Sequence, residues 1–227
     1  MSAVSSTDKL LLEARARQSQ GISNAAIYRM VAEALAGRQT GETLVDIGCG
    51  TGSLRPFISH LCADYIGVDA IRYEEFPADA AFHQADLDSG HVPLPDGAAD
   101  VAVAIEIIEH LENPRALMRE LARLTKPGGW VIVTTPNQLS LLSLLTLIVK
   151  RRFNAFQDVH YPAHITALLE VDLRRMAAEC GLTDVTTSYS HEGRLPLTGW
   201  NYPTRLARLF PQALSDNVLL IGRKPFE

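Results

Sequence analysis

The chain has 227 residues, of which 47% are hydrophobic and 21% are charged, and its formal net charge is −5. These values fit a single globular domain over residues 1–227, and the acidic balance disfavours general binding to nucleic acid. The three cysteines, Cys49, Cys62 and Cys180, include no CxxC pair, which argues against a disulfide framework and a structural zinc site.

The chain contains no segment typical of membrane insertion or secretion. Residues 1–18 lack the apolar core of a signal peptide. The most apolar stretch, residues 139–149, is shorter than the roughly 20 residues that span a bilayer. We therefore expect a cytoplasmic protein.

In chain order, residues 1–40 carry apolar positions at helical spacing and predict a helical cap with a break at 21–23. Strands are then predicted at 43–47, 65–68, 81–84, 101–105, 130–134, 183–189 and 217–222. Helices are predicted at 53–62, 114–124, 139–152 and 166–180, and a turn at 126–129. The alternation predicts an α/β fold with a mostly parallel sheet, whose ligand lies beyond the carboxyl ends of the strands.

A glycine-rich turn, Gly48-Cys49-Gly50-Thr51-Gly52, follows the first predicted strand. Such glycines permit a tight turn and close approach of backbone to a ligand, although the spacing differs from the dinucleotide pattern GxGxxG. Asp46 lies just before this turn, where it would repel a pyrophosphate and attract a ligand with an ammonium and a sulfonium, such as S-adenosylmethionine. Alternatively, Asp46 accepts hydrogen bonds from the turn's own amides, and the two roles are compatible.

Acidic residues also end the second and third predicted strands. Asp69 is placed to accept hydrogen bonds from both ribose hydroxyls of an adenosine. Asp86 could accept a hydrogen bond from the adenine amino group while the Leu87 amide donates to a ring nitrogen. The alternative for Asp86 is an ordinary solvated surface acid.

Five ordered segments resemble the motifs of the class I S-adenosylmethionine-dependent methyltransferases. They are residues 45–52 (motif I), 67–69 (ribose motif), 85–87 (adenine motif), 100–111 (fourth-strand motif) and 124–129 (the turn before the fifth strand). The resemblance implies a Rossmann-like sheet of seven mostly parallel strands with one antiparallel edge strand and helices on both faces. It also implies a pocket for S-adenosylmethionine, and for its product S-adenosylhomocysteine, formed by Asp46, Gly48, Cys49, Gly50, Gly52, Asp69, Ala70, Asp86, Leu87 and Glu106.

His110 follows the fourth predicted strand and is the candidate catalytic base. Methyl transfer is an in-line displacement, so the protein mainly aligns the reacting atoms. A base is needed when the nucleophile keeps its proton at neutral pH, as a hydroxyl does. The alternative is a histidine that caps or packs against the next helix.

The segment Glu106-Ile107-Ile108-Glu109-His110 resembles the ExxEH pattern of ubiquinone-pathway O-methyltransferases and small-RNA 2′-O-methyltransferases. In those families this pattern can hold a divalent metal. The resemblance implies a site for Mg²⁺ or Mn²⁺ at Glu106, Glu109 and His110, completed by His160 or His164. The same pattern occurs in class I methyltransferases with no known metal, where Glu106 would lie near the cofactor and His110 would line the pocket.

Residues 1–40, 138–165 and 190–215 are where the family varies most, so we expect them to form the acceptor side. Residues 139–152 predict an amphipathic helix with a basic end, which either packs on the core as a lid or contacts a membrane or lipophilic substrate. The aromatic residues of these segments, Phe153, Phe156, Tyr161, Trp200 and Tyr202, either line an acceptor pocket or belong to the core.

The sequence therefore predicts methyl transfer, at oxygen, to a small or lipid-like organic acceptor, with peripheral membrane contact through 139–152 as a further hypothesis. Three alternatives remain at this point. They are an NAD-dependent oxidoreductase with the same fold, a metal-assisted RNA 2′-O-methyltransferase, and a non-catalytic methyltransferase-like module.

Overall fold

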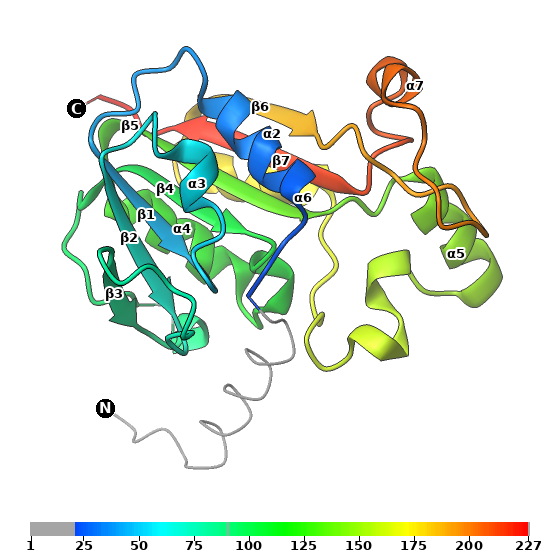
Figure 1. The fold of residues 1–227 in the computed structure, drawn as a ribbon, viewed down its shortest axis with the longest axis horizontal. Helices are drawn as coiled ribbons and strands as arrows, with labels where there is room; N and C mark the ends of the chain where they lie inside the picture. The colour runs from blue at the N-terminus through cyan, green and yellow to red at the C-terminus, as the bar shows by residue number, and fades with distance from the viewer. Residues whose placement is uncertain (1–20, 90, 227) are drawn as a thin grey trace.

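The computed structural model describes residues 21–89 and 91–226 (Figure 1). The first half of the expected helical cap, residues 1–20, lies outside the described residues. Seven strands form one sheet: β1 (Thr43–Ile47), β2 (Asp64–Asp69), β3 (Ala81–Gln84), β4 (Ala99–Ile105), β5 (Thr125–Pro136), β6 (Thr183–Tyr189) and β7 (Asn217–Arg223). Their order is β3-β2-β1-β4-β5-β7-β6.

The expected mostly parallel sheet is confirmed. Strands β1 to β5 pair in parallel, and β7 pairs antiparallel with both β5 and β6. The antiparallel strand β7 therefore lies one place in from the edge, which β6 forms. Because the chain order reverses between β1 and β4, the carboxyl ends of these strands frame the crevice in which α/β proteins bind ligands.

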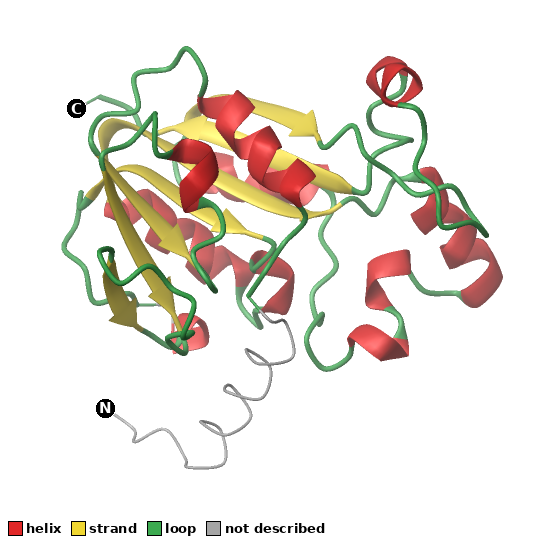
Figure 2. Cartoon of the chain, viewed as in Figure 1, coloured by secondary structure: helices red, strands yellow, loops and turns green. Residues whose placement is uncertain are grey.

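Helices cover both faces of the sheet (Figure 2). The α-helices are α2 (Ala25–Leu35), α3 (Arg55–Ile58), α4 (Pro114–Leu124), α5 (Leu141–Lys150), α6 (Glu170–Glu179) and α7 (Thr204–Leu209). Short 3₁₀ turns are η1 (Leu87–Ser89), η2 (Ile108–His110), η3 (Asn154–Phe156) and η4 (Asp158–His160). None of the helices in the described segments is long and apolar enough to cross a membrane.

Side chains of β4 alternate between two apolar layers, as the two-residue period of a strand requires. Val101 and Val103 pack in a cluster with α2 and α3, whereas Ala102 and Ala104 pack in a cluster with α4 and α6. All four are fully buried. This two-sided burial explains why β4 has a continuous apolar sequence.

Two predicted helices are shorter than expected. The segment 53–62 is an α-helix only over Arg55–Ile58 and continues as turns, with the Leu61 amide donating to the Ile58 carbonyl at 2.8 Å. The segment 166–180 becomes helical only at Glu170, after the extended N-cap Leu169, and the Thr166 amide and hydroxyl donate to the carbonyls of Glu109 and Leu111.

The turn predicted at 126–129 is wrong, because these residues belong to β5. The pairing of β4 with β5 shifts register between Ala99 and Val101, which lets the glycines stay within the strand. A Cβ on Gly129 would lie 2.6 Å from the Asp100 carbonyl oxygen, so a residue without a side chain is needed there. The glycines thus permit close strand pairing at an irregular site.

Candidate active site

A cavity of about 440 Å³ opens at the carboxyl ends of β1, β2 and β4. Its volume is within the range of small-molecule sites. Eight predicted cofactor and catalytic residues line it: Asp46, Gly48, Cys49, Asp69, Ala70, Leu87, Glu106 and His110. Gly50, Gly52 and Asp86 are not among its lining residues, although they support those that are.

The glycine turn shapes this cavity through its backbone. Gly48, Gly50 and Gly52 all have positive φ, at 74°, 51° and 76°. A Cβ on Gly50 would lie 2.0 Å from the Gly21 carbonyl oxygen, and the Thr51 amide donates to that oxygen at 3.2 Å. The glycines therefore allow the segment preceding α2 to close over the turn.

Asp46 is a buried acid with one oxygen facing no partner. Its side chain is 2% exposed, and its Oδ2 accepts a 2.5 Å hydrogen bond from the Tyr65 hydroxyl. Its Oδ1 has no hydrogen-bond partner among the described residues. Burial raises the pKa of Asp46 to about 7, against the lowering effect of the Tyr65 bond.

The amides of the glycine turn bond elsewhere than to Asp46. Gly48 and Cys49 donate to the Val68 carbonyl at 2.8 and 3.2 Å. The Gly50 amide donates to Asp69 Oδ2 at 2.8 Å. Among these amides the one that binds a carboxylate therefore binds Asp69, and Asp46 accepts from none of them.

Asp69 ends β2 and joins the turn to the cavity wall. It is 8% exposed, and its Oδ1 accepts a 2.7 Å bond from the Ala70 amide. Burial raises its pKa, and hydrogen bonds from the amides of Gly50 and Ala70 oppose that rise. The Ile71 amide acts on the same carboxylate, and because a carboxylate can accept about four hydrogen bonds, Asp69 retains capacity for a ligand hydroxyl.

After β3 the chain presents Leu87 rather than Asp86 to the cavity. Asp86 Oδ1 accepts a 3.0 Å bond from the Asp88 amide, which closes the η1 turn. Leu87 is 8% exposed, and Leu87 and Asp88 both line the cavity. Asp86 thus shapes the turn that places these two residues.

Two glutamates follow β4. Glu106 has a φ of 50°, and its carboxylate accepts bonds from the Thr134 hydroxyl at 2.8 Å and Asn217 Nδ2 at 2.7 Å. Burial raises the pKa of Glu106 to about 7. Glu109 is fully buried, its Oε2 accepts from the Thr135 hydroxyl at 3.1 Å, and its Oε1 has no partner among the described residues. Burial and the neighbouring Glu106 charge raise the pKa of Glu109 well above its usual range.

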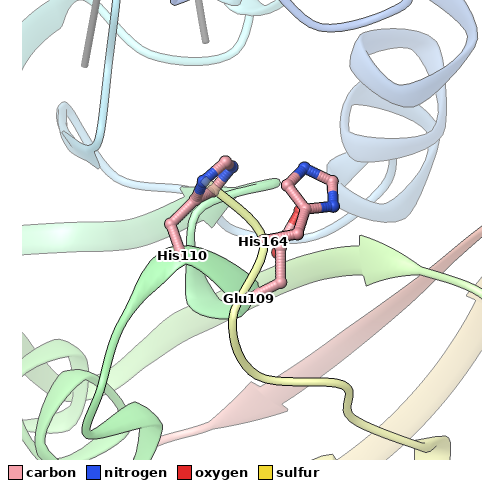
Figure 3. Close-up of side chains that lie close together, drawn as sticks. All are labelled: Glu109, His110 and His164. Carbon is pink, nitrogen blue, oxygen red and sulfur yellow. The ribbon is translucent and has the colours of Figure 1, made fainter. Parts of the chain in front are cut away.

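Histidines from two segments meet above Glu109 (Figure 3). The ring centroids of His110 and His164 are 4.7 Å apart, and His160 stacks on His164 at 5.4 Å. His110 Nδ1 lies 2.9 Å from the Ala163 carbonyl oxygen, and His164 Nδ1 lies 2.8 Å from that of Ala155. Because a carbonyl only accepts, each Nδ1 donates a hydrogen to its carbonyl, and the neutral His164 ring then carries its lone pair on Nε2.

Glu109, His110 and His164 form a candidate metal-ligating group. Their potential ligand atoms all lie within 4.8 Å of one another. Of the residues expected to join them, neither Glu106 nor His160 belongs to this group. The Glu106 carboxylate is instead bound by Thr134 and Asn217. Burial and the nearby His110 lower the pKa of His164 to about 4, so its ring is neutral at physiological pH.

A second cavity, of about 430 Å³, adjoins the first. The two share Asn24, Ile27, His160 and His164 as lining residues. The second cavity is built from the end of β5, the start of α5 and residues 192–217, and its lining is rich in amide side chains, including Asn137, Gln138, Asn154, Asn201 and Asn217.

Sequence reasoning missed the contribution of residues 21–24 and Tyr28 to the first cavity. The signal that could have found them is the Gly21-Ile22-Ser23 break in the helical pattern, which leaves backbone at the cavity mouth. Tyr28 is buried, and its hydroxyl accepts a 2.8 Å bond from the Ser23 amide. Of the five aromatic residues expected to line a pocket or join the core, Tyr161 and Trp200 are instead 71% and 79% exposed.

Comparison with known proteins gives consistent results. Residues 17–187 match a family model described as a methyltransferase domain. A probable S-adenosylmethionine-dependent methyltransferase of Mycolicibacterium smegmatis is 31% identical over 116 residues, which are 50% of this chain and 45% of the relative. The ubiquinone biosynthesis O-methyltransferase of Bordetella avium is 34% identical over 116 residues, 46% of each chain. The chain thus spans about half the length of the curated relatives it matches.

A solved structure shows the same fold over nearly the whole chain. The S-adenosylmethionine-dependent methyltransferase from Archaeoglobus fulgidus superposes with a TM-score of 0.65 at 18% identity, covering 92% of this chain and 97% of that one. These matches favour the methyltransferase interpretation over the NAD-dependent oxidoreductase considered from the sequence.

Proposed function

The chain belongs to the class I S-adenosylmethionine-dependent methyltransferases, and we propose that it transfers a methyl group to an oxygen of a small or lipid-like organic acceptor. The observation that carries the cofactor assignment is one cavity lined by two buried acids, Asp46 and Asp69, beside a turn that only glycines can form. The match to a ubiquinone biosynthesis O-methyltransferase supports transfer to oxygen.

The chain's residues suit S-adenosylmethionine in a specific arrangement. Asp69 would accept hydrogen bonds from the ribose hydroxyls, with Ala70 beside it. The Asp46 carboxylate, whose Oδ1 has no partner in the described structure, would accept from the ammonium group. Leu87 would lie against the adenine, on the turn that Asp86 closes, and Gly48 and Cys49 would form the wall along the methionine side.

His110 is the residue we assign as the base. The bound cofactor supplies a methyl group on a sulfonium, which is already a good leaving group. His110 Nδ1–H bonds to the Ala163 carbonyl, which fixes the orientation of the ring, and Nε2 is the nitrogen that would take the proton of the acceptor. Removal of the proton of an acceptor hydroxyl by this nitrogen would increase the rate by about 10²–10⁴-fold.

A divalent cation held by Glu109, His110 and His164 is the alternative way to activate the hydroxyl. The buried, unpartnered Oε1 of Glu109 and the neutral imidazole of His164 suit such an ion. Their potential ligand atoms lie within 4.8 Å of one another, which is comparable with the roughly 4.4 Å that can separate two ligand atoms of one ion. The ion would lower the pKa of the acceptor hydroxyl.

The second cavity is where we place the acceptor. Its charged side chains are already paired: Arg194 with Asp216 at 3.2 Å, and Glu192 with Arg29 at 2.8 Å. An ionic acceptor would have to break one of these pairs, whereas a neutral hydroxylated group can bond to the amide side chains directly. This favours a neutral acceptor group over the phosphates of RNA.

Calorimetric titration with S-adenosylhomocysteine tests the cofactor site. We expect Asp69→Ala to weaken binding by about 1.5–3 kcal/mol, because charge-assisted hydrogen bonds to the ribose are lost. Asp79→Ala is the matched control, since Asp79 is an exposed acid paired with Arg55 and does not line the cavity. Unchanged affinity in Asp69→Ala, or tighter binding of NAD than of S-adenosylhomocysteine, would refute the assignment.

A screen with labelled S-adenosylmethionine first identifies an acceptor. Activity in the presence of a chelator then distinguishes catalysis by His110 as a base from activation by a cation. If His110 acts as a base, His110→Ala lowers kcat by about 10²–10⁴, and the wild type keeps full activity in chelator. If the cation activates the hydroxyl, chelator abolishes activity and added Mg²⁺ or Mn²⁺ restores it. Full activity of His110→Ala would contradict both versions.

A further inference from the structure

The polar side of helix α5 faces the interior of the protein. Ser143 is its one buried residue, and the Ser143 hydroxyl donates to Gln138 Oε1 at 3.4 Å and accepts from the Asn154 amide at 3.3 Å. On the outside, Ile148 and Val149 are 76% and 78% exposed. A helix that packed on the core as a lid would bury the apolar side instead.

Two other segments extend this apolar exposure. Residues 194–201 form a hairpin in which the Leu195 amide donates to the Trp200 carbonyl at 2.8 Å. Its tip fully exposes Leu197 and leaves Trp200 79% exposed, while Leu209 and Phe210 at the end of α7 are 72% and 58% exposed. Figure 1 shows α5 and α7 at the same end of the molecule, to the right of the sheet.

A hydrogen bond connects two of the segments that carry these side chains. The Leu141 amide, at the start of α5, donates to the Ala213 carbonyl at 2.7 Å, just after α7. Twelve of the fifteen large apolar side chains exposed among the described residues lie in 141–161 and 197–210. Six of these side chains are called the apolar ridge below: Ile148, Val149, Leu197, Trp200, Leu209 and Phe210. Apolar exposure concentrated in this way marks an interaction surface.

The charge around the ridge is basic although the chain is acidic overall, at −5. Segments 139–161 and 194–211 contain Lys150, Arg151, Arg152, Arg194, Arg205 and Arg208, and a single acid, Asp158. Arg152 pairs with Asp158 and Arg194 with Asp216. The exposed Arg205 and Arg208 form no ion pair within the described part of the chain, so they remain available to an anionic partner.

We propose that the apolar ridge docks the protein on the surface of an anionic lipid bilayer. Exposed aliphatic side chains with Trp would enter the boundary between headgroups and acyl chains, and the flanking Arg and Lys would lie among anionic headgroups. The chemistry favours a lipid surface over a second copy of this chain, because a second copy would bring the same uncompensated positive charge to the contact. The inference goes beyond the proposed function and does not depend on the atom methylated.

The position of α5 also connects docking with the second cavity. Ser140 and Ser143 line that cavity from the inner side of the helix, while Ile148 and Val149 point to the outside. A protein docked through the ridge would therefore have its polar cavity next to the bilayer surface. This placement suits an acceptor whose polar head enters the cavity while its apolar part stays in the lipid.

Vesicle sedimentation of the full chain tests the proposal. We expect it to bind vesicles of phosphatidylcholine mixed with phosphatidylglycerol, to bind phosphatidylcholine vesicles weakly, and to be released by salt. The double variant Ile148→Ser with Val149→Ser should bind the mixed vesicles about tenfold less tightly or worse. Val171→Ser, which changes an exposed valine on α6, is the matched control and should bind like the wild type.

Charge reversal and oligomeric state complete the test. Arg205→Glu with Arg208→Glu should lose about tenfold or more in affinity for the mixed vesicles and little of the weak affinity for neutral ones. Calorimetry with S-adenosylhomocysteine should give wild-type affinity in every ridge variant, which shows that the fold and cofactor site are intact. Equal sedimentation of the ridge variants and the wild type would overturn the proposal. A dimer in ultracentrifugation that the ridge variants dissociate, with no vesicle binding, would overturn it as well.

Discussion

The two cavities have similar volumes, about 440 and 430 Å³, but they are built in different ways. The first is formed by strand ends and a glycine turn, and it holds two buried acids, Asp46 and Asp69, that make no ion pair in the described structure. The second is formed by loops and amide side chains, and each of its charged residues, Glu192, Arg194 and Asp216, belongs to an ion pair. The acids of the first cavity therefore have no counter-charge among the described residues, whereas the charged side chains of the second cavity do.

This difference indicates how each cavity selects its ligand. A buried carboxylate without a partner is costly, so the first cavity favours a ligand that brings positive charge and hydroxyl donors. A balanced, amide-lined cavity discriminates by the number and placement of hydrogen bonds. We therefore expect large effects from small changes in the first cavity and modest effects in the second.

Replacing a glycine by alanine should give the largest difference in cofactor affinity between the first cavity and the acceptor side. In Gly50→Ala the new Cβ would meet the Gly21 carbonyl oxygen at 2.0 Å, at a φ of 51°. We expect S-adenosylhomocysteine binding to weaken by about 2–3 kcal/mol, roughly 30- to 150-fold, because the turn must shift. Calorimetry measures this directly.

Gly199→Ala is the matched control in the acceptor-side hairpin, where a Cβ would meet nothing within 4 Å. It should bind S-adenosylhomocysteine like the wild type. Circular dichroism of Gly50→Ala should show a retained fold. Equal affinities of Gly50→Ala and the wild type would mean that the glycine turn does not position the cofactor.

A pH series should show the electrostatic imbalance of the first cavity. The pKa of Asp46 is raised to about 7, so below that pH the free protein holds a neutral carboxyl group. An ammonium ligand prefers the carboxylate, so affinity for S-adenosylhomocysteine should rise as pH increases toward 7 and then level off. The limit is about tenfold per pH unit on the acid side.

Methylthioadenosine, which lacks the amino-acid portion, is the matched ligand and should bind with little pH dependence. Glu106 also has a pKa of about 7, so Asp46→Asn identifies the responsible group and should remove the pH dependence for S-adenosylhomocysteine. Persistence of the full dependence in Asp46→Asn would assign it to Glu106 instead.

The first cavity was largely predictable because its residues follow short apolar runs. Asp46, Asp69 and the glycines lie at strand ends, and parallel strands bring their carboxyl ends together whatever the loops do. The contact of Gly50 with Gly21 could not be predicted, because it depends on where α2 packs. For α5 the pattern predicted an amphipathic helix but not which side faces inward, since that is decided by Ser143 bonding to Gln138 and Asn154.

The smallest expected effect belongs to the second cavity. Asn201 lines it with an exposed side chain. If a neutral hydroxylated group binds there, Asn201→Ala removes one hydrogen bond, worth about 0.5–1.5 kcal/mol, and should raise the acceptor KM several-fold with kcat unchanged. Thr198→Ala, in the same hairpin but away from the lining residues, is the control. A fall in kcat, or weaker S-adenosylhomocysteine binding, in Asn201→Ala would mean that the two cavities do not divide acceptor and cofactor between them.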